Sequence, residues 1–207
     1  MRDVIARACD EDTGRWVEVW NDDCWENPIR DWDWNCRVEI YHRDYEGLGM
    51  EHDPSIDYTG GLKMTLRAYE HSGIAFSIGG DYPFNDPWDS YNCGFIGMTK
   101  EQLDRACGGD KIKAVKYFNE VINLLNAYAN GNIYGFTCYG PDGDDVESMG
   151  GFYDTYNTCD GLFEAMADNM PSEFDELAKR LSWGQLDPLE VTITRRVRGY
   201  KSEEAIA

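Results

Sequence analysis

Alternating apolar and polar residues predict a series of short β-strands along this chain. The clearest is residues 62–69, LKMTLRAY, in which every second residue is apolar. Arg15 to Trp20, RWVEVW, alternates in the same way. The pattern predicts further strands at residues 37–42, 74–78, 93–98, 133–139, 146–148 and 189–197.

Helical periodicity is confined to the second half of the chain. TKEQ, starting at Thr99, matches the capping box S/T-x-x-E/Q and predicts a helix that runs to about Cys107. A second helix is expected from Lys111 to the Asn130-Gly131 pair, because Val115, Phe118, Ile122 and Leu125 recur at helical spacing. Residues 160–182 predict helical segments broken at Pro171, with Ser172 as the cap of the next helix.

The order of these elements predicts the fold class. Strands come in runs separated by helices, mostly without βαβ alternation, which is typical of an α+β protein. We expect an antiparallel sheet with helices packed mainly on one face. No linker or repeat interrupts the chain, so residues 1–207 are expected to form a single domain, with residues 44–61 as a long surface loop.

One stretch, DWDW at residues 31–34, places the largest apolar side chains beside strongly hydrated ones. If this stretch is extended, Trp32 and Trp34 share one face while Asp31 and Asp33 share the other. The tryptophans are then expected to pack on the protein while the carboxylates face water.

The net charge of −20 is unevenly distributed. Residues 1–60 carry −10 and residues 140–190 carry −11, whereas residues 61–139 carry only −1. If the two acidic regions converge in space, the protein has a strongly acidic face, which repels nucleic acid and attracts basic proteins. The basic segment TRRVRGYK near the end is expected to pair with the chain's own acids.

The cysteines, the apolar runs and the N-terminal residues indicate the cellular setting. The seven cysteines are odd in number and include no C-x-x-C pair, so we expect reduced thiols in a reducing cytoplasm. No apolar run is long enough for a membrane span, and the acidic N-terminus predicts no secretion signal.

Candidate catalytic and metal-binding groups are sparse. PDGDD at residues 141–145 fails the EF-hand pattern and predicts a hairpin turn. His71, Ser72 and Asp89 could supply a base, nucleophile and orienting group, but adjacent strand residues point to opposite faces. His42 and His52 could join a carboxylate around a metal, although their spacing is uninformative. We therefore predict no metal, no cofactor and no catalytic residue.

Several short segments occur together in an order that resembles a known group of proteins. They are ENPIRDWDW, YHRDY, YEHSGI, PWDS followed by GFI and a capped helix, IYGF, and an E-S-x-x-GFY segment. Together they resemble a family of uncharacterised accessory proteins carried by bacteriophages and other mobile elements of gut bacteria. Tyr91-Asn92 and Gly150 depart from that pattern. The resemblance implies a bacterial cytoplasmic setting and carries over no catalytic residue.

Charge and setting together predict an acidic inhibitor of a host defence nuclease, such as a CRISPR effector or a restriction enzyme. It would act as a DNA mimic by occupying the basic nucleic-acid-binding surface of that protein. The expected contacts are Trp25 and nine acids: Asp22, Asp23, Glu26, Asp31, Asp33, Asp142, Asp144, Asp145 and Glu147.

Two alternatives remain open. One is a small enzyme or a binder of a nucleotide-like ligand, with a pocket near His71, Trp88 and Asp89. The other is that the charge serves solubility alone. Direct binding of DNA or RNA is not expected at this net charge.

Overall fold

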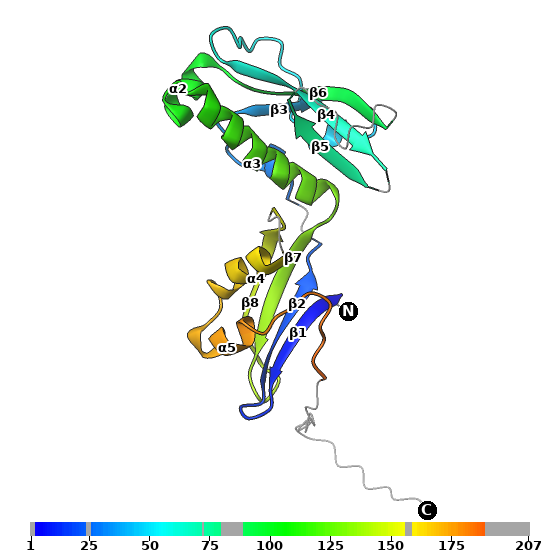
Figure 1. Cartoon of the computed structure of the whole chain (residues 1–207), viewed down its shortest axis with the longest axis vertical. Coiled ribbons are helices and arrows are strands. Elements are labelled where there is room, and N and C mark those ends of the chain that lie inside the picture. The colour runs from blue at the N-terminus through cyan, green and yellow to red at the C-terminus, as the bar shows by residue number, and fades with distance from the viewer. Residues whose placement is uncertain (1–2, 24–25, 72, 80–88, 156–158, 189–207) are drawn as a thin grey trace, which may run out of the picture.

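The computed structural model describes residues 3–23, 26–71, 73–79, 89–155 and 159–188. They form two antiparallel four-stranded sheets with helices, which confirms the α+β class but divides the expected sheet into two. Figure 1 shows the two sheets one beyond the other along the long axis of the molecule. We call residues 3–23 and 133–188 the sheet A lobe, and residues 26–132 the sheet B lobe.

The strands are β1 (Val4–Asp10), β2 (Arg15–Asn21), β3 (Arg37–Ile40), β4 (Leu62–Glu70), β5 (Ile74–Ile78), β6 (Ser90–Met98), β7 (Ile133–Tyr139) and β8 (Asp145–Tyr153). The helices are α1 (Pro28–Asp31), α2 (Lys100–Cys107), α3 (Lys111–Ala129), α4 (Cys159–Ala167) and α5 (Asp175–Ala178), with 3₁₀ turns η1 (Glu46–Leu48) and η3 (Ser172–Phe174).

Sheet A has the strand order β1-β2-β7-β8 and is covered by helices on one face (Figure 1). Val17, Val19 and Phe136 point into a core that Leu162 of α4 and Phe174 of η3 complete. The alternate residues of β2 and β7 lie on the other face. There Trp16 stacks on Tyr139 with ring centroids 4.8 Å apart, and the Trp20 indole donates a hydrogen bond to Thr137 Oγ1.

Sheet B has the strand order β3-β6-β4-β5, and α3 lies along one face. Val38, Leu66 and Ile96 form its core with Phe118 and Leu125 of α3. Tyr58 of the predicted surface loop reaches the opposite face, and there its ring and that of Tyr41, which follows β3, contact Phe95 of β6. The helices therefore cover one face of each sheet, and in sheet B the loop contributes to the other face.

The two lobes meet at a small aromatic cluster supplied by the DWDW stretch. Trp32 packs edge-on against Tyr153 of β8, with ring centroids 5.4 Å apart, and joins Ile133 in this cluster. Trp34 instead contacts Tyr117 of α3. Asp31 and Asp33 are exposed, as expected for an extended stretch, although Asp31 is the last residue of α1.

The structure confirms two of the predicted helix signals and contradicts a third. Both hydrogen bonds of the Thr99 capping box are present, and α3 ends at Asn130 as expected. The prediction of Ser172 as a helix cap is wrong: Ser172 is the first residue of η3, and no side chain caps that turn. The preceding Pro171 carbonyl instead accepts the Phe174 N–H, which closes the turn through the backbone.

The strand predictions differ from the structure mainly in length. β6 and β8 are longer than expected, and β1 was not predicted. The predicted strand at residues 189–197 lies outside the described residues. A single cooperative unit remains a prediction, because two cores and a small junction are compatible with one or two unfolding steps. Among the described residues, no helix has the length and apolar character needed to span a membrane.

Candidate functional site

The turns of two β-hairpins project from the same end of sheet A. Trp16, at the start of β2, pairs with Tyr139, at the end of β7, so the β1–β2 and β7–β8 turns must lie side by side. The close approach of Gly14 and Pro141 confirms this, because a Cβ on Gly14 would lie 3.2 Å from the proline Cβ. We call this end the hairpin tips.

The hairpin tips carry most of one acidic group predicted from the sequence. Asp142, Asp144 and Asp145 are exposed in or beside the β7–β8 turn, and Glu147 is exposed on β8. The β1–β2 turn adds Asp10, Glu11 and Asp12, which sequence analysis missed. The signal that could have found them is DEDTG, a turn-forming sequence directly before the predicted strand at residue 15.

Asp10 has a structural role within this group. The Thr13 hydroxyl donates a 2.6 Å hydrogen bond to its carboxylate, and the backbone N–H groups of Asp12 and Thr13 donate to the same side chain. These bonds, that from the Thr13 hydroxyl most of all, lower the pKa of Asp10 below its ordinary value. The carboxylate therefore stays ionised while it shapes the turn.

The second predicted acidic group lies at the opposite end of β8, beside the junction of the lobes. Asp22 accepts a 2.7 Å hydrogen bond from the Gly151 N–H, and Glu26 accepts one from the Trp32 indole. Asp31 accepts one from the Asn27 N–H. Asp23 and Asp33 are exposed. This group, like the hairpin tips, combines structural hydrogen bonding with surface charge.

The two acidic groups therefore do not merge into one patch. They lie at the two ends of β8, an edge strand of nine residues that spans about 27 Å at the usual strand rise. None of the nine predicted acids forms an ion pair among the described residues. Trp25, the predicted aromatic contact, lies outside the described residues.

The charge also differs between the two lobes. The sheet A lobe holds 19 Asp and Glu against 4 Lys and Arg, a net charge of −15, whereas the sheet B lobe carries −7. The sequence split placed the first acidic region across both lobes. The structure shows that β1 and β2, from the start of the chain, share one sheet with β7 and β8, which concentrates the charge there.

A second polar cluster lies in the sheet B lobe around Glu39, whose side chain is only 1% exposed. One carboxylate oxygen accepts from Arg37 Nε at 3.3 Å, and the other accepts from the Tyr41 hydroxyl at 2.9 Å and lies 2.7 Å from His52 Nδ1. Burial alone would raise the pKa of Glu39, but the hydrogen bonds from His52, Tyr41 and Arg37 lower it below its ordinary value.

The Glu39 cluster holds the long loop against sheet B. A groove of about 460 Å³ runs beside it and is lined by Arg30, Tyr41 and His52 among others. The groove mixes Arg30 with Glu46 and Glu51 and so selects no ligand charge. The arrangement supports a structural clamp better than a catalytic site.

Of the remaining candidates of the sequence analysis, the structure brings only His71 and Asp89 together among the described residues. His71 lies 3.4 Å from Asp89 in an exposed pair, and Trp88 and Ser72 are outside the described residues. His42 stacks on Tyr45 and packs against Tyr91, away from any metal arrangement. No cluster of three potential metal ligands occurs among the residues that the structure describes.

Three buried thiols have raised pKa values and are therefore not activated as nucleophiles. Desolvation raises the pKa of Cys36, Cys93 and Cys138 to about 12 in each case. A thiol with such a pKa is protonated at neutral pH and is a poor nucleophile. These three cysteines serve as small apolar core residues.

Searches with the chain find no matching family model, no matching curated protein and no matching solved structure. The function therefore has to be inferred from the chain's own residues.

Proposed function

We propose that this protein is an acidic accessory protein of a bacteriophage or mobile element that inhibits a host defence nuclease in the bacterial cytoplasm. It would bind a basic nucleic-acid-binding surface through the sheet A lobe. The observation that carries the proposal is the net charge of −15 on that lobe, with two unpaired acidic groups at the ends of one exposed edge strand.

The spacing of these groups suits a nucleic-acid-binding surface. Such surfaces neutralise rows of phosphates with Lys and Arg and release bound counterions as they do so. Carboxylates spread over about 27 Å can engage several of those Lys and Arg side chains at once. Most of the predicted acids, including Asp142 and Asp144, are exposed, so a partner can approach them without unfolding the sheet.

The charge on the edge strand has a second explanation, which accounts for only some of the acids. Charged side chains on an edge prevent pairing with the edges of other molecules. Asp145 and Glu147 on β8 suffice for that purpose. The strand ladder does not include Glu11 and Asp12 of the β1–β2 turn or Asp142 and Asp144 of the β7–β8 turn, and protection of the edge does not account for these acids.

The test is inhibition of DNA cleavage by purified restriction enzymes and CRISPR effectors, with duplex DNA as competitor. In the test variant, Asp142, Asp144 and Asp145 are changed to Asn. In the matched control, three exposed acids of the sheet B lobe, Glu46, Glu101 and Glu120, are changed to Gln, which removes the same charge.

We expect the wild type to inhibit at least one of these enzymes and the DNA to relieve that inhibition. The tip variant should inhibit much less, while the control should stay close to wild type. Absence of inhibition across the panel, or equal loss in both variants, would contradict the proposal. Unchanged thermal unfolding would show that both variants fold, as expected for exposed charges.

A further inference from the structure

The last described residues of the chain pair with the free edge of sheet A. Residues 184–187 run parallel to β1, with hydrogen bonds from the Arg7 N–H to the Gln185 carbonyl and from the Asp187 N–H to the Arg7 carbonyl. Because the pairing is parallel, the chain is heading in the direction of β1, toward the hairpin tips.

The pairing stops at Asp187 for a clear reason. The next N–H of β1, that of Cys9, donates to the Asp187 side chain at 3.1 Å instead of to a backbone carbonyl. Arg180 bonds both the Asp187 carboxylate and the Cys9 carbonyl. Pro188 follows and has no N–H to offer. The parallel pairing is therefore interrupted at Asp187, and Pro188 lies near Cys9.

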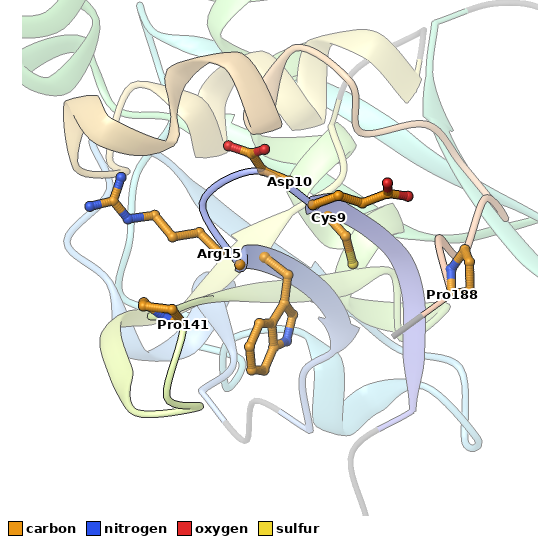
Figure 2. Close-up of a pocket in the computed structure, with 8 residues that line it drawn as sticks. Cys9, Asp10, Arg15, Pro141 and Pro188 are labelled. Atoms are coloured by element: carbon orange, nitrogen blue, oxygen red, sulfur yellow. The ribbon is translucent and has the colours of Figure 1, made fainter. Parts of the chain in front are cut away.

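Pro188 lies at the wall of a cavity of about 240 Å³ at the hairpin tips. Figure 2 shows Pro188 and Pro141 on opposite sides of this cavity, with Cys9 between them. Trp16 adds an apolar wall, and Asp10 and Glu11 bring carboxylates. The cavity thus combines apolar groups with two acids and one base, Arg15, and Pro188 lies directly beside it.

The sequence that follows Pro188 matches this surface in polarity and in charge. Leu189, Val191 and Ile193 alternate with polar residues, and three arginines and a lysine follow within residues 195–201. Seven extended residues reach about 23 Å, so the arginines can contact any acid of the hairpin tips. This segment and the C-terminal end of β1 are complementary in polarity and in charge.

We propose that residues 189–201 dock on the hairpin tips of their own chain. Their apolar residues would enter the cavity beside Trp16, and their bases would neutralise the acids of the two turns. Tethering favours this contact, since a short connection within one chain gives an effective concentration in the millimolar range. Even weak ionic contacts can then hold the segment in place.

The docking does not depend on the proposed function, but its consequence rests on it. The docked segment covers the tip acids Asp142, Asp144 and Asp145, so a basic partner must displace it before binding there. The segment would act as a built-in competitor and limit binding to partners with a stronger basic surface.

The test compares nuclear magnetic resonance spectra of three full-length proteins without any partner. They are the wild type, a tail variant with Arg195, Arg196 and Arg198 changed to Gln, and a control with Lys111, Lys113 and Lys116 of the sheet B lobe changed to Gln. Amide signals of residues 10–14 and 141–144 should shift in the tail variant and stay in place in the control. High salt should shift the wild type in the same direction, because it screens the contact.

Carbodiimide cross-linking supplies a second readout, because it joins Lys201 directly to a neighbouring carboxylate. The wild-type monomer should give links from Lys201 to acids of the hairpin tips. Unchanged tip signals in the tail variant, or Lys201 links only to other parts of the chain, would overturn the proposal. Links found only in dimers would overturn it in favour of a second copy. None of these outcomes bears on whether the protein inhibits a nuclease.

Discussion

At the residue scale, Glu39 shows how a buried charge can be stabilised by its surroundings. Its carboxylate is almost wholly buried but accepts hydrogen bonds from Arg37 and Tyr41 and lies in hydrogen-bonding distance of His52. A buried acceptor that loses such partners costs free energy, and more so when it is charged. The predicted strand at residues 37–42 holds Arg37, Glu39 and Tyr41 at alternate positions, but sequence analysis could not add His52, because it comes from a loop without periodicity.

Changing Glu39 to Gln should lower the free energy of unfolding by about 2 kcal/mol at pH 7, since bonds to a charged acceptor are replaced by weaker ones. The control is Glu51→Gln, whose side chain is 93% exposed and should change stability by less than about 0.5 kcal/mol. Denaturant titrations of the three proteins measure both values. Equal stability of the Glu39 variant and the wild type would rule out the clamp.

The same pair of proteins gives a pH prediction. The folded pKa of Glu39 is below the ordinary value of 4.5, so the charge stabilises the fold above that value. The stability advantage of the wild type over Glu39→Gln should therefore be constant at neutral pH and should shrink as pH falls below about 4.5. An advantage that grew on acidification would contradict the lowered pKa.

At the element scale, β7 depends on a glycine that lets a tryptophan lie flat on the sheet. A Cβ on Gly135 would come within 2.4 Å of the Trp20 ring and 2.8 Å of the Met149 carbonyl. Gly135→Ala should therefore destabilise the protein by about 1–3 kcal/mol through overpacking. Gly47→Ala is the control, because no atom lies within 4 Å of its added Cβ. Thermal unfolding of both variants measures the difference, and equal midpoints would refute this packing.

Elements with a strong local signal were predictable from the sequence, and those without one were not. The strand at residue 62 and the helix after Thr99 have clean periodicity or a capping box, and both are present. β1, VIARACD, was not predicted, because its outward positions include Arg7 and Cys9 and its buried inward positions are small alanines. The division into two sheets depends on pairing between distant strands, such as β2 with β7, which no local pattern encodes.

At the scale of the whole molecule, the junction decides whether the two cores unfold together. Trp32 is the aromatic link from the sheet B lobe to Tyr153, and its indole also binds Glu26. We expect one calorimetric transition for the wild type and two for Trp32→Ala, since the variant removes that contact. Trp183→Ala, which removes an aromatic ring inside the sheet A lobe, should lower the transition without splitting it. Two transitions in the wild type would defeat the single-domain prediction.

The acidic surface was predictable in its residues but not in its arrangement. Nine acids could be named from the sequence, and those that the structure places at the hairpin tips are exposed there. Their neighbours Asp10, Glu11 and Asp12 could not be added without knowing that two hairpin turns adjoin. The concentration of charge on one lobe also became visible only after the strands of sheet A were assigned.

The most direct test of the central claim is the association rate with an inhibited nuclease, measured against ionic strength. The wild type should associate more slowly as salt rises, because a long-range field steers the encounter and screening shortens its range to about 8 Å at physiological salt. The variant with Asp142, Asp144 and Asp145 changed to Asn should show a lower rate and a shallower salt slope, while dissociation changes less. A flat salt dependence for both proteins would contradict binding by charge mimicry.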